Sequence, residues 1–434
     1  MLRAVAVVAL GMFAGCATAP PPSNVGAAIA AIEPAKAIAA IAAPTGAGAE
    51  APRSVLLVSV DGLGAEMLSP DVAPRITAMA ASGVRAEWMN PSYPVLTFPN
   101  HYTLVTGLRP DRHGVVHNKM EDPTLGRFEN RLSADLGEQW WTDGTPVWVS
   151  AERAGLPTAT YFWPGSDAVI HGTRPTEWKR YDEEVGNAER VDTVLDWLSQ
   201  PADTRPRFVT LYFSDVDHAA HGFGPHSPQA RDAITHVDAM IGQLLDGLRE
   251  RGVQDLVDVV LVSDHGMQEV PPGHAISTDT MVGPEVARLV ADGQSIGFAP
   301  LSGREAEAEA RLLGRHDNYD CWRKADLPAH WQYGQHRRVP PILCQMHAGW
   351  DALAAERFPW RDPQATRGSH GYEPALPSMR AVFIAHGLSF RSGAILPPID
   401  NVDVYPLLMH LLGLPPGPND GDADALQALR PVRH

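Results

Sequence analysis

The 434-residue chain lacks an excess of basic residues. It has 35 Lys and Arg against 51 Asp and Glu, which gives a formal net charge of −16 at pH 7. Such a balance argues against binding nucleic acids through a broadly basic surface, and we expect no sequence-specific nucleic-acid partner either. An acidic protein can still bind phosphate where positive charge is concentrated locally, and bound metal ions are one source of that charge.

Long hydrophobic runs are also lacking, apart from one at the N-terminus. The apolar stretch 4–13 is too short to span a bilayer and is typical of a signal peptide. The small residues before Cys16 resemble a bacterial lipobox, although Phe13 stands where Leu is usual. We therefore expect 1–16 to direct export to the periplasm, with lipidated Cys16 as the mature N-terminus and the only membrane anchor, in the outer membrane. The alternative is ordinary signal cleavage near 17–19.

Aromatic residues are nearly missing from the next segment, 17–51, which is rich in Ala, Pro and Gly and has no sustained amphipathic period. Such a composition cannot bury enough apolar surface to fold and predicts a tether. We expect the folded domain to occupy 52–434.

Cysteine is scarce, because only Cys321 and Cys344 remain after Cys16. In an oxidising compartment two cysteines predict one disulfide, which stabilises a loop of this size by roughly 3 kcal/mol on the chain-entropy model. A cysteine zinc site is the alternative, but the sequence has no CxxC pair to support it.

Four apolar runs without polar alternation predict strands that are buried on both faces. They are Ser54–Val60, Phe208–Phe213, Leu256–Val262 and Met379–Ala385. Amphipathic segments lie between them, of which Pro228–Arg251 is the clearest. This alternation predicts an α/β fold with a central, mostly parallel sheet sandwiched by helices. Residues from about 270 to 370, rich in Pro, His, Trp and charge, interrupt the pattern and predict an inserted lobe beside the site.

Acidic residues follow three of these runs closely. Asp61 and Asp264 come at the ends of the first and third runs, and Asp217 lies a few residues after the second. Because ligands bind outside the carboxyl ends of strands in open α/β sheets, these carboxylates are expected to converge on one rim.

Histidines accompany the same strand ends. His265 follows Asp264 directly, His221 lies four residues after Asp217 and so on the same side of a helical turn, and His370 lies in a glycine-flanked loop. Carboxylates and imidazoles together suit zinc or a similar divalent ion. Each pair alone is more often a structural hydrogen bond, so the prediction rests on their combination.

A nucleophile candidate lies in the segment 94–102. Pro99 suits the first turn of a helix, which would put Thr97 at the helix N-terminus, where the dipole favours a phosphate. A nearby metal could help to ionise the hydroxyl. The alternative is that Thr97 is only a helix N-cap.

Taken together, these motifs resemble the nucleotide pyrophosphatase/phosphodiesterase family of the alkaline phosphatase superfamily. The resemblance runs in family order from about residue 55 to 414. The motifs that carry it are Val60-Asp61-Gly62, Thr97 to Tyr102, Gly107 to Pro110 with His113, Gly114 and Asn118, Asp217 to Pro225, Ser263 to Met267, Gly368 to Gly371, and Asn401 to Tyr405. One departure is Ala220, which stands where the family has Gly and should be tolerated within a helical turn.

This resemblance implies an alkaline-phosphatase-like fold and two zinc ions per chain. One ion would be held by Asp217, His221 and His370; the other would be held by Asp61, Asp264, His265 and the Thr97 hydroxyl. Asn118 and the Thr97 backbone amide would bind a non-bridging phosphate oxygen. Phe98, Tyr181 and Tyr212 stand where family members stack a nucleobase, and rim packing is the alternative for these aromatics.

The implied reaction is zinc-dependent hydrolysis of phosphodiester or pyrophosphate bonds in nucleotides through a nucleotidyl-threonine, with release of a nucleoside monophosphate. A choline-type phospholipid-head-group phosphodiesterase, a phosphomonoesterase and a lipoprotein that binds metal or ligand without turnover remain as alternatives. A sulfatase is excluded, because it needs Cys or Ser followed by x-Pro-x-Arg, whereas Thr97 is followed by Phe-Pro-Asn-His.

Overall fold

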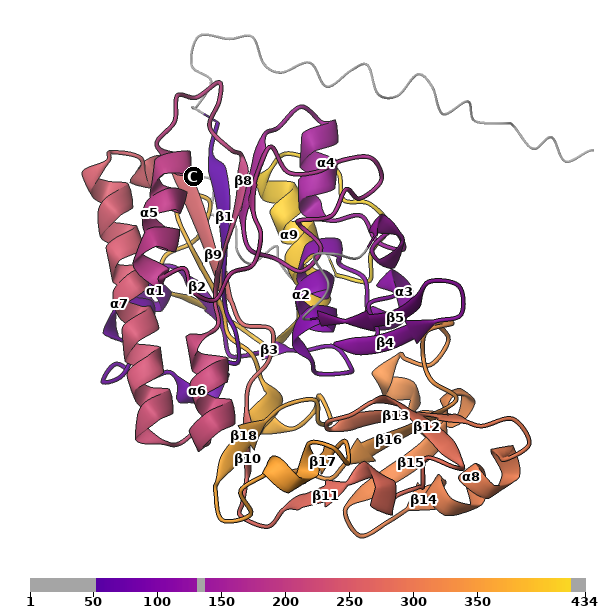
Figure 1. The fold of residues 1–434 in the computed structure, drawn as a ribbon. Helices are drawn as coiled ribbons and strands as arrows, with labels where there is room; N and C mark the ends of the chain where they lie inside the picture. Colours follow the sequence, from indigo (N-terminus) through magenta and orange to yellow (C-terminus); the bar gives the residue numbers. More distant parts are fainter. Residues whose placement is uncertain (1–51, 131–136, 423–434) are drawn as a thin grey trace, which may run out of the picture. The chain divides into compact units, whose positions relative to one another are not determined.

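A computed structural model describes residues 52–130 and 137–422, so the predicted signal peptide, Cys16 and the tether lie outside the described residues. The centre of the described chain is an eight-stranded sheet (Figure 1). In spatial order its strands are β20 (Ala394–Leu396), β2 (Val84–Ala86), β19 (Phe383–His386), β9 (Val257–Val262), β1 (Ser54–Val60), β8 (Phe208–Phe213), β6 (Thr158–Tyr161) and β7 (Glu177–Lys179).

The sheet is mostly parallel, as predicted. Strands β9, β1, β8, β6 and β7 run in one direction. The fourth predicted strand differs, because β19 runs antiparallel to β9 and begins only at Phe383. Met379, which was expected to open it, instead ends a 3-10 turn, Pro377–Met379, in which its N–H donates to the Leu376 carbonyl rather than to a neighbouring strand.

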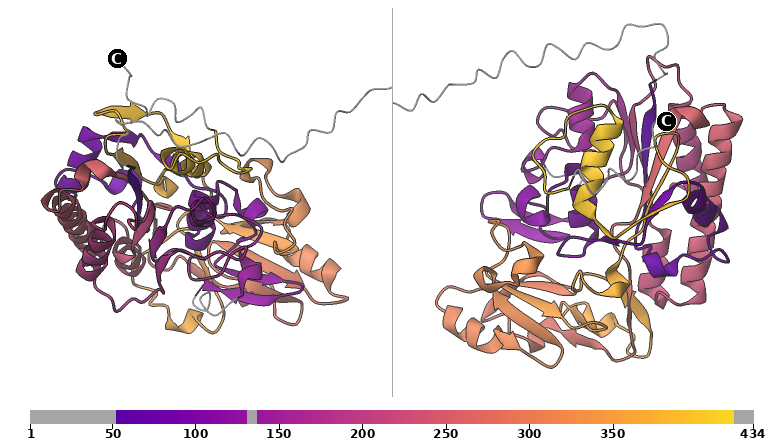
Figure 2. Two further views of the ribbon diagram at one scale, coloured as in Figure 1. Left: turned by 90° about the horizontal axis from the view of Figure 1, so that it is seen from above. Right: turned by 180° about the vertical axis from the view of Figure 1, so that it is seen from behind.

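Helices cover both faces of the sheet, and the views in Figure 2 agree on this arrangement. One face carries α1 (Pro74–Ser82), α5 (Asn187–Leu198) and α7 (Pro228–Glu250), whereas the other carries α2 (Thr97–Thr106), α4 (Val147–Arg153) and α9 (Val404–Leu411). Alternate residues of β1 enter the two cores, with Leu56 on the first side and Val55 on the second. This two-sided burial explains why the strand has no polar alternation.

Two short α-helices and two pairs of short strands are the remaining α-helices and strands of the described residues outside the lobe. They are α3 (Pro110–His113), α6 (Asp215–Phe223), the hairpin of β4 (Lys119–Asp122) and β5 (Gly126–Glu129), and the parallel pair β3 (Met89–Asn90) and β21 (Ile399–Asp400); α8 (Glu305–Leu312) belongs to the lobe. No helix in 52–130 or 137–422 is both long and apolar enough to cross a membrane.

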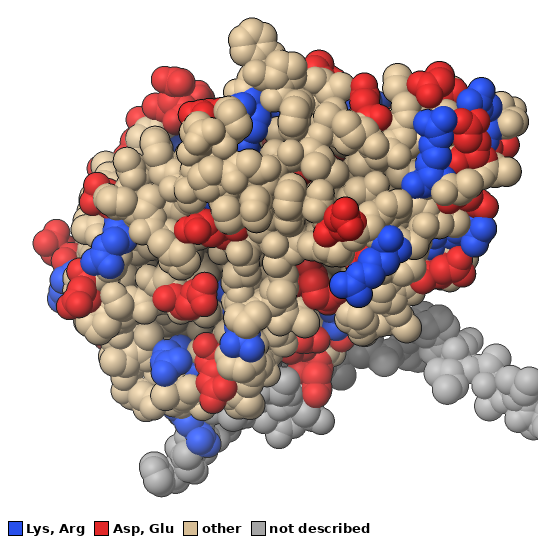
Figure 3. All heavy atoms as spheres, turned by 90° about the horizontal axis from the view of Figure 1, so that it is seen from below, with Lys and Arg blue, Asp and Glu red and all other residues tan. Residues whose placement is uncertain are grey.

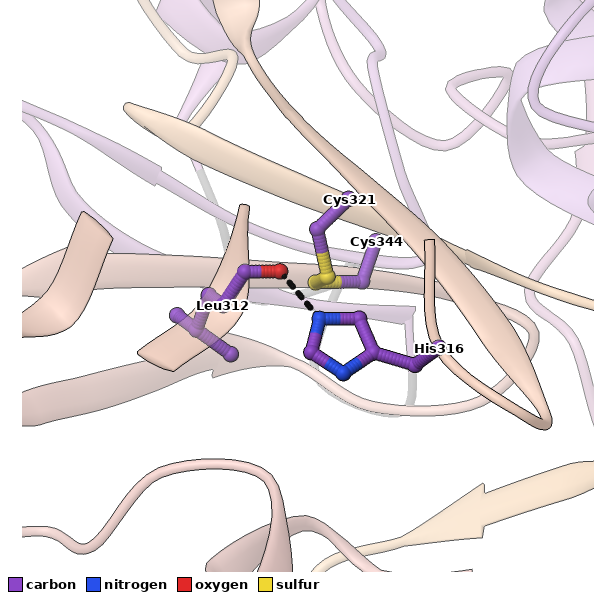
Figure 4. The surroundings of a disulfide bond; sticks show 4 residues. All are labelled: Leu312, His316, Cys321 and Cys344. Atoms are coloured by element: carbon purple, nitrogen blue, oxygen red, sulfur yellow. Dashed lines mark hydrogen bonds between the residues drawn. A yellow bond between two sulfur atoms is a disulfide. The ribbon is translucent and has the colours of Figure 1, made fainter. Parts of the chain in front are cut away.

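The inserted lobe has a sheet and a core of its own. Five mostly short strands form an antiparallel sheet in the order β12 (Ala287–Ala291), β13 (Ser295–Pro300), β16 (Ile342–Met346), β15 (Tyr319–Arg323) and β14 (Gly314–Arg315). A disulfide joins Cys321 to Cys344, which are register partners on β15 and β16 (Figure 4). Beside it, the His316 ring lies within hydrogen-bond distance of the Leu312 carbonyl.

The lobe begins and ends in a two-stranded stem. Strand β10 (Gln268–Val270) leads into the lobe and pairs antiparallel with β18 (Arg367–Ser369), which leads out of it. A second pair lies further into the lobe, where β11 (Ala275–Ser277) and β17 (Asp351–Leu353) run parallel to each other. The lobe is also fixed to the α/β body by a fully buried ion pair of Arg338 with Asp122, whose N–O distance is 2.8 Å.

Charged residues on the described surface are of mixed sign. On the face that Figure 3 shows, acidic and basic side chains are interspersed and form no broad basic area.

Candidate active site

The three predicted carboxylates meet because their strands are neighbours. Strand β1 pairs in parallel with β8 on one side and β9 on the other, so their carboxyl ends lie at one edge. Asp61 follows β1, and its backbone N–H bonds to the Phe213 carbonyl at the end of β8 (2.9 Å). Asp264 follows β9, and Asp217 lies in the first turn of α6 just after β8.

Asp217, His221 and His370 form the first group of possible metal ligands. Asp217 Oδ1 lies 3.3 Å from His221 Nε2, one helical turn away, and 3.7 Å from His370 Nε2. The other ring nitrogens face backbone carbonyls, since His221 Nδ1 is 2.9 Å from Gly368 O and His370 Nδ1 is 2.9 Å from Val95 O. A ring that donates from Nδ1 leaves the Nε2 lone pair free to ligate a cation.

Asp61, Asp264 and His265 lie together beside the first group. His265 Nε2 is 3.0 Å from Asp264 Oδ2 and 3.5 Å from Asp61 Oδ1, and its Nδ1 faces the Gly266 carbonyl (3.0 Å). One ligand atom each from Asp61, Asp217 and His265 also lies within 4.8 Å of the other two. The two sets of predicted ligands therefore share one buried rim.

The carboxylates of this rim are unusual because they are buried and incompletely paired. Within the described residues, Asp61 Oδ1, Asp217 Oδ1 and Asp264 Oδ2 have no hydrogen-bond partner. Burying several carboxylates together is strongly unfavourable unless a cation or a proton offsets the charge. Three such oxygens beside the Nε2 atoms of His221, His265 and His370 fit the donor set of divalent ions such as zinc.

The titration of the rim shows the same demand for positive charge. Burial raises the pKa of Asp61 well above its ordinary value, and the neighbouring Asp264 and Asp217 raise it further. Burial lowers the pKa of His265, but Asp264 and Asp61 outweigh this and raise it to about 9. Burial lowers the pKa of His370 to about 3, so that ring is neutral and able to ligate.

Thr97 lies at the N-terminus of α2, next to this rim. Its Oγ1 is 3.5 Å from His265 Nε2. The N-cap position belongs to Leu96, and Thr97 is the first helical residue, so the alternative of a plain threonine cap is wrong. The backbone N–H of Phe98 donates to Asn118 Oδ1 (2.9 Å), which brings the Asn118 amide to the same helix end.

His101 is a site residue for which the sequence suggested no role. Its Nδ1 lies 2.9 Å from the Thr97 carbonyl oxygen and 3.3 Å from Asp264 Oδ2, and its Nε2 lies 2.8 Å from Ser59 Oγ. The one available signal was its place four residues after Thr97, on the same side of a helix. His101 thus connects the helix that carries Thr97 to the two strands that carry Asp61 and Asp264.

A cavity of about 840 Å³ opens beside Thr97, and the three predicted aromatics line it. Tyr181 is 44% exposed and meets the Tyr212 ring edge-on at 6.1 Å between centroids. Phe98 is half-buried and packs edge-on against Phe128. The Tyr212 hydroxyl donates to Asp61 Oδ2 (2.6 Å), a contact that its predicted stacking role did not include.

Comparisons with known proteins identify the family of the chain. A family model described as type I phosphodiesterase/nucleotide pyrophosphatase matches residues 55–373. An uncharacterized pyrophosphatase/phosphodiesterase of Schizosaccharomyces pombe is 33% identical over 399 residues, covering 88% of this chain and 81% of that protein. Human ectonucleotide pyrophosphatase/phosphodiesterase family member 1 is 34% identical over 394 residues, which cover 88% of this chain but only 42% of the human protein.

Solved structures show the same similarity in three dimensions. Murine ectonucleotide pyrophosphatase/phosphodiesterase 5 superimposes with a TM-score of 0.82 at 31% identity, covering 87% of this chain and all of the murine chain. One of these murine structures is an inactive variant, in which a threonine is replaced by alanine, in complex with AMP. The corresponding human protein superimposes with a TM-score of 0.81 at 30% identity.

Proposed function

The chain belongs to the type I phosphodiesterase/nucleotide pyrophosphatase family and is thus a hydrolase of phosphodiester or diphosphate bonds, and we propose that it cleaves nucleotides through a covalent nucleotidyl-threonine. The observation that carries this proposal is the position of Thr97 Oγ1, 3.5 Å from His265 Nε2 and beside three buried, incompletely paired carboxylates. The role of a threonine is supported by the murine relative, whose inactive variant carries alanine in place of a threonine.

Two zinc ions fit the donor atoms of the rim. Asp217, His221 and His370 would hold one ion, and Asp61, Asp264 and His265 with the Thr97 hydroxyl would hold the other. When bound, the ions supply positive charge that lowers the pKa of the Thr97 hydroxyl and stabilises the departing oxygen. The unpartnered carboxylate oxygens and the Nδ1-anchored rings support this assignment.

The chain's own residues then divide the reaction into two displacements. Thr97 Oγ1 attacks phosphorus and forms a new P–O bond while the bond to the leaving group breaks. Water next attacks the same phosphorus, the P–O bond to Thr97 breaks, and the threonine oxygen regains a proton as a nucleoside monophosphate is released. Asn118 Oδ1 already accepts the Phe98 N–H, so its Nδ2 is the donor that would face a non-bridging phosphate oxygen.

A nucleotide is the substrate that the cavity beside Thr97 suits best. Its volume of about 840 Å³ and its aromatic lining suit a nucleoside, and Phe98, Tyr181 and Tyr212 would contact the base. The AMP held by the murine relative supports this choice. A phosphate monoester carries more negative charge than a diester and would be bound better by a cationic side chain. The neutral amide of Asn118 therefore favours diesters over monoesters.

Threonine exchange tests the proposal directly. Thr97→Ala should lose nearly all hydrolysis of bis-p-nitrophenyl phosphate while keeping its zinc content and its melting temperature, because Asp61, Asp264 and His265 remain to hold the ion beside it. Thr97→Ser should keep part of the activity, since a hydroxyl remains. Diesterase activity that survived in Thr97→Ala would rule out the threonine intermediate.

Substrate assays separate the rival activities. The wild-type protein should cleave bis-p-nitrophenyl phosphate in clear preference to p-nitrophenyl phosphate, and the opposite preference would favour a phosphomonoesterase. Strong activity on choline phosphodiesters with weak activity on ATP would favour a head-group phosphodiesterase. A protein without turnover on any of these would be a binding lipoprotein.

Export is part of the proposal and rests on the sequence alone. Residues 1–16 would direct the protein to the periplasm, and lipidated Cys16 would anchor it to the outer membrane through the 17–51 tether. Cys16→Ser should move the protein from the membrane fraction to the soluble periplasmic fraction and abolish labelling by a fatty-acid analogue. Unchanged fractionation would favour ordinary signal cleavage.

A further inference from the structure

A second cavity, of about 580 Å³, adjoins the metal-ligand rim and is lined by His221 and His370. The two cavities meet along Asn118, His218, His221 and His370, which line both. Thr97 lines only the first cavity. Since an in-line displacement expels its leaving group opposite the nucleophile, the second cavity lies where the departing part of the substrate would go.

The lining of the second cavity is unusually cationic for so acidic a protein. It contains four cations, Lys119, Arg357, Arg361 and Arg367, against two carboxylates, Asp292 and Asp351. This is the local positive charge that an acidic phosphate-binding protein needs.

The ion pairs in this cavity leave donors unused. Asp292 is shared by Lys119 (2.6 Å) and Arg357 (3.2 Å), and Asp351 pairs with Arg361 (2.7 Å). A guanidinium has five N–H donors in a fixed fork that matches phosphate oxygens. These pairs therefore hold the side chains in place without exhausting their capacity to bind an anion.

Arg367 is the cation most closely tied to the reacting centre. It opens β18, and the next residue, Gly368, is the one whose carbonyl faces His221 Nδ1 at 2.9 Å. Gly368 also packs so tightly on α6 that a Cβ there would lie 2.5 Å from the Ala220 carbonyl oxygen. Within the described residues, the buried Nε of Arg367 has no hydrogen-bond partner, so this guanidinium keeps a donor available.

An aromatic side chain stands at the outer end of this cavity. Arg357, Arg361 and Arg367 also line a shallower hollow of about 210 Å³ together with Trp360. Trp360 is 86% exposed, which is rare for the largest apolar side chain and marks a surface available to a planar partner.

We propose that this arginine-lined cavity is the subsite for the leaving group, that it selects leaving groups carrying a phosphate chain, and that Trp360 stacks on the base when the leaving group is itself a nucleotide. The inference rests on the proposed function. In this proposal, the arginines and the tryptophan of the lobe segment 357–367 determine which leaving groups the protein accepts.

Three substrates that share a nucleotidyl group test the subsite. The p-nitrophenyl ester of thymidine 5′-monophosphate expels an aryl group without phosphate, ATP expels pyrophosphate, and diadenosine tetraphosphate expels ATP. Arg367→Gln should lower kcat/KM for both polyphosphates by about tenfold to a hundredfold, the effect of losing a charge-assisted hydrogen bond. Its kcat/KM for the aryl ester should remain unchanged.

Two further variants control for loss of structure or of charge in general. Arg357→Gln, whose partner Asp292 keeps Lys119, should show the same selectivity. Arg249→Gln removes an exposed arginine of α7 that lies outside the cavity and should change no substrate. An equal loss on all three substrates in Arg367→Gln, or no loss on ATP, would overturn the subsite.

Exchanges at position 360 test the aromatic contact. Trp360→Ala should lower kcat/KM for diadenosine tetraphosphate by about tenfold relative to ATP, which is within the range measured for stacking of one base. Trp360→Phe should recover most of that difference, and equal effects on both substrates would overturn the role of Trp360. If the wild-type protein cleaved none of the three substrates, the proposed function itself would fail. If it cleaved the aryl ester but the variants lost no more kcat/KM on the polyphosphates than on the aryl ester, only the subsite would fail.

Discussion

Tyr212 connects the cavity beside Thr97 to the metal-ligand rim. The sequence placed it among the aromatics expected to meet the base, and its ring does line that cavity. Its hydroxyl, however, donates to Asp61 Oδ2 (2.6 Å) and leaves Asp61 Oδ1 as the oxygen without a partner. The tyrosine therefore orients a carboxylate as well as offering a face to the substrate.

Removing only that hydroxyl should weaken the metal site. Tyr212→Phe should lower zinc affinity by about tenfold to a hundredfold, because partners that orient a ligand contribute on that scale. Titration against a competing chelator measures this. Tyr181→Phe, which alters another tyrosine of the same cavity, should leave zinc affinity unchanged, and an equal loss in both variants would contradict the orienting role.

The residue types of the site could be predicted, whereas their contacts could not. Acidic residues at strand ends and the i, i+4 pair of Asp217 and His221 are visible in the chain because both patterns are local. The role of His101 is not, since it depends on Ser59 and Asp264, which only the packing of α2 on the sheet brings near.

Among the elements, β15 and β16 are joined both by register and by the disulfide. Cys321 and Cys344 are buried, and the bond closes a loop with a sequence separation of 23. Such a cross-link stabilises mainly by restricting the unfolded chain, by about 3 kcal/mol for this loop length.

Reduction should therefore destabilise the lobe. Exchange of both cysteines (Cys321→Ala with Cys344→Ala) should lower the melting temperature, because the cross-link is lost. Alanine is preferred to serine, since serine would bury a hydroxyl without a partner. A reducing agent should lower the melting temperature of the wild-type protein and not that of the double variant. If the reductant shifted both proteins equally, its effect would not come from this bond.

The elements themselves were predicted to different degrees. The buried runs that became β1, β8 and β9, and the long amphipathic helix α7, carry their signal in continuous stretches of sequence. The direction of β19 does not, because antiparallel pairing with β9 follows from the path of the chain through the lobe. The lobe sheet was missed as well, since its edge strand β14 is only two residues long and a register irregularity interrupts β12.

At the scale of the whole molecule, two buried histidines make the fold sensitive to acid. His113 Nδ1 accepts the Val115 N–H (3.1 Å), and His117 Nδ1 accepts the Lys119 N–H (3.0 Å), so both rings are held neutral. Burial lowers the pKa of His113 to about 3 and that of His117 to about 4. His117 Nε2 also reaches the Ser295 carbonyl in the lobe (3.0 Å).

Acidification should then favour the unfolded chain. Unfolded histidines titrate near 6.5, so below that pH the unfolded state binds more protons than the folded state. Stability should be complete above about pH 6.5 and should fall by up to about 1.4 kcal/mol per pH unit for each histidine as the pH drops toward 4. Urea unfolding across this range measures the slope, which should be shallower in His113→Gln with His117→Gln; an unchanged slope would assign the acid sensitivity to other groups.

The stem of β10 and β18 makes the chain enter and leave the lobe at neighbouring points. Residues between these strands can be lengthened, shortened or exchanged in evolution without moving β1, β8 or β9, which precede the acidic ligands. With the proposed subsite in the lobe, the residues of the catalytic rim and most of those that select the leaving group are encoded in separate stretches of one gene. Natural selection can retune the second while the first stays fixed, and a lobe transplanted between relatives at this stem would carry its preference with it.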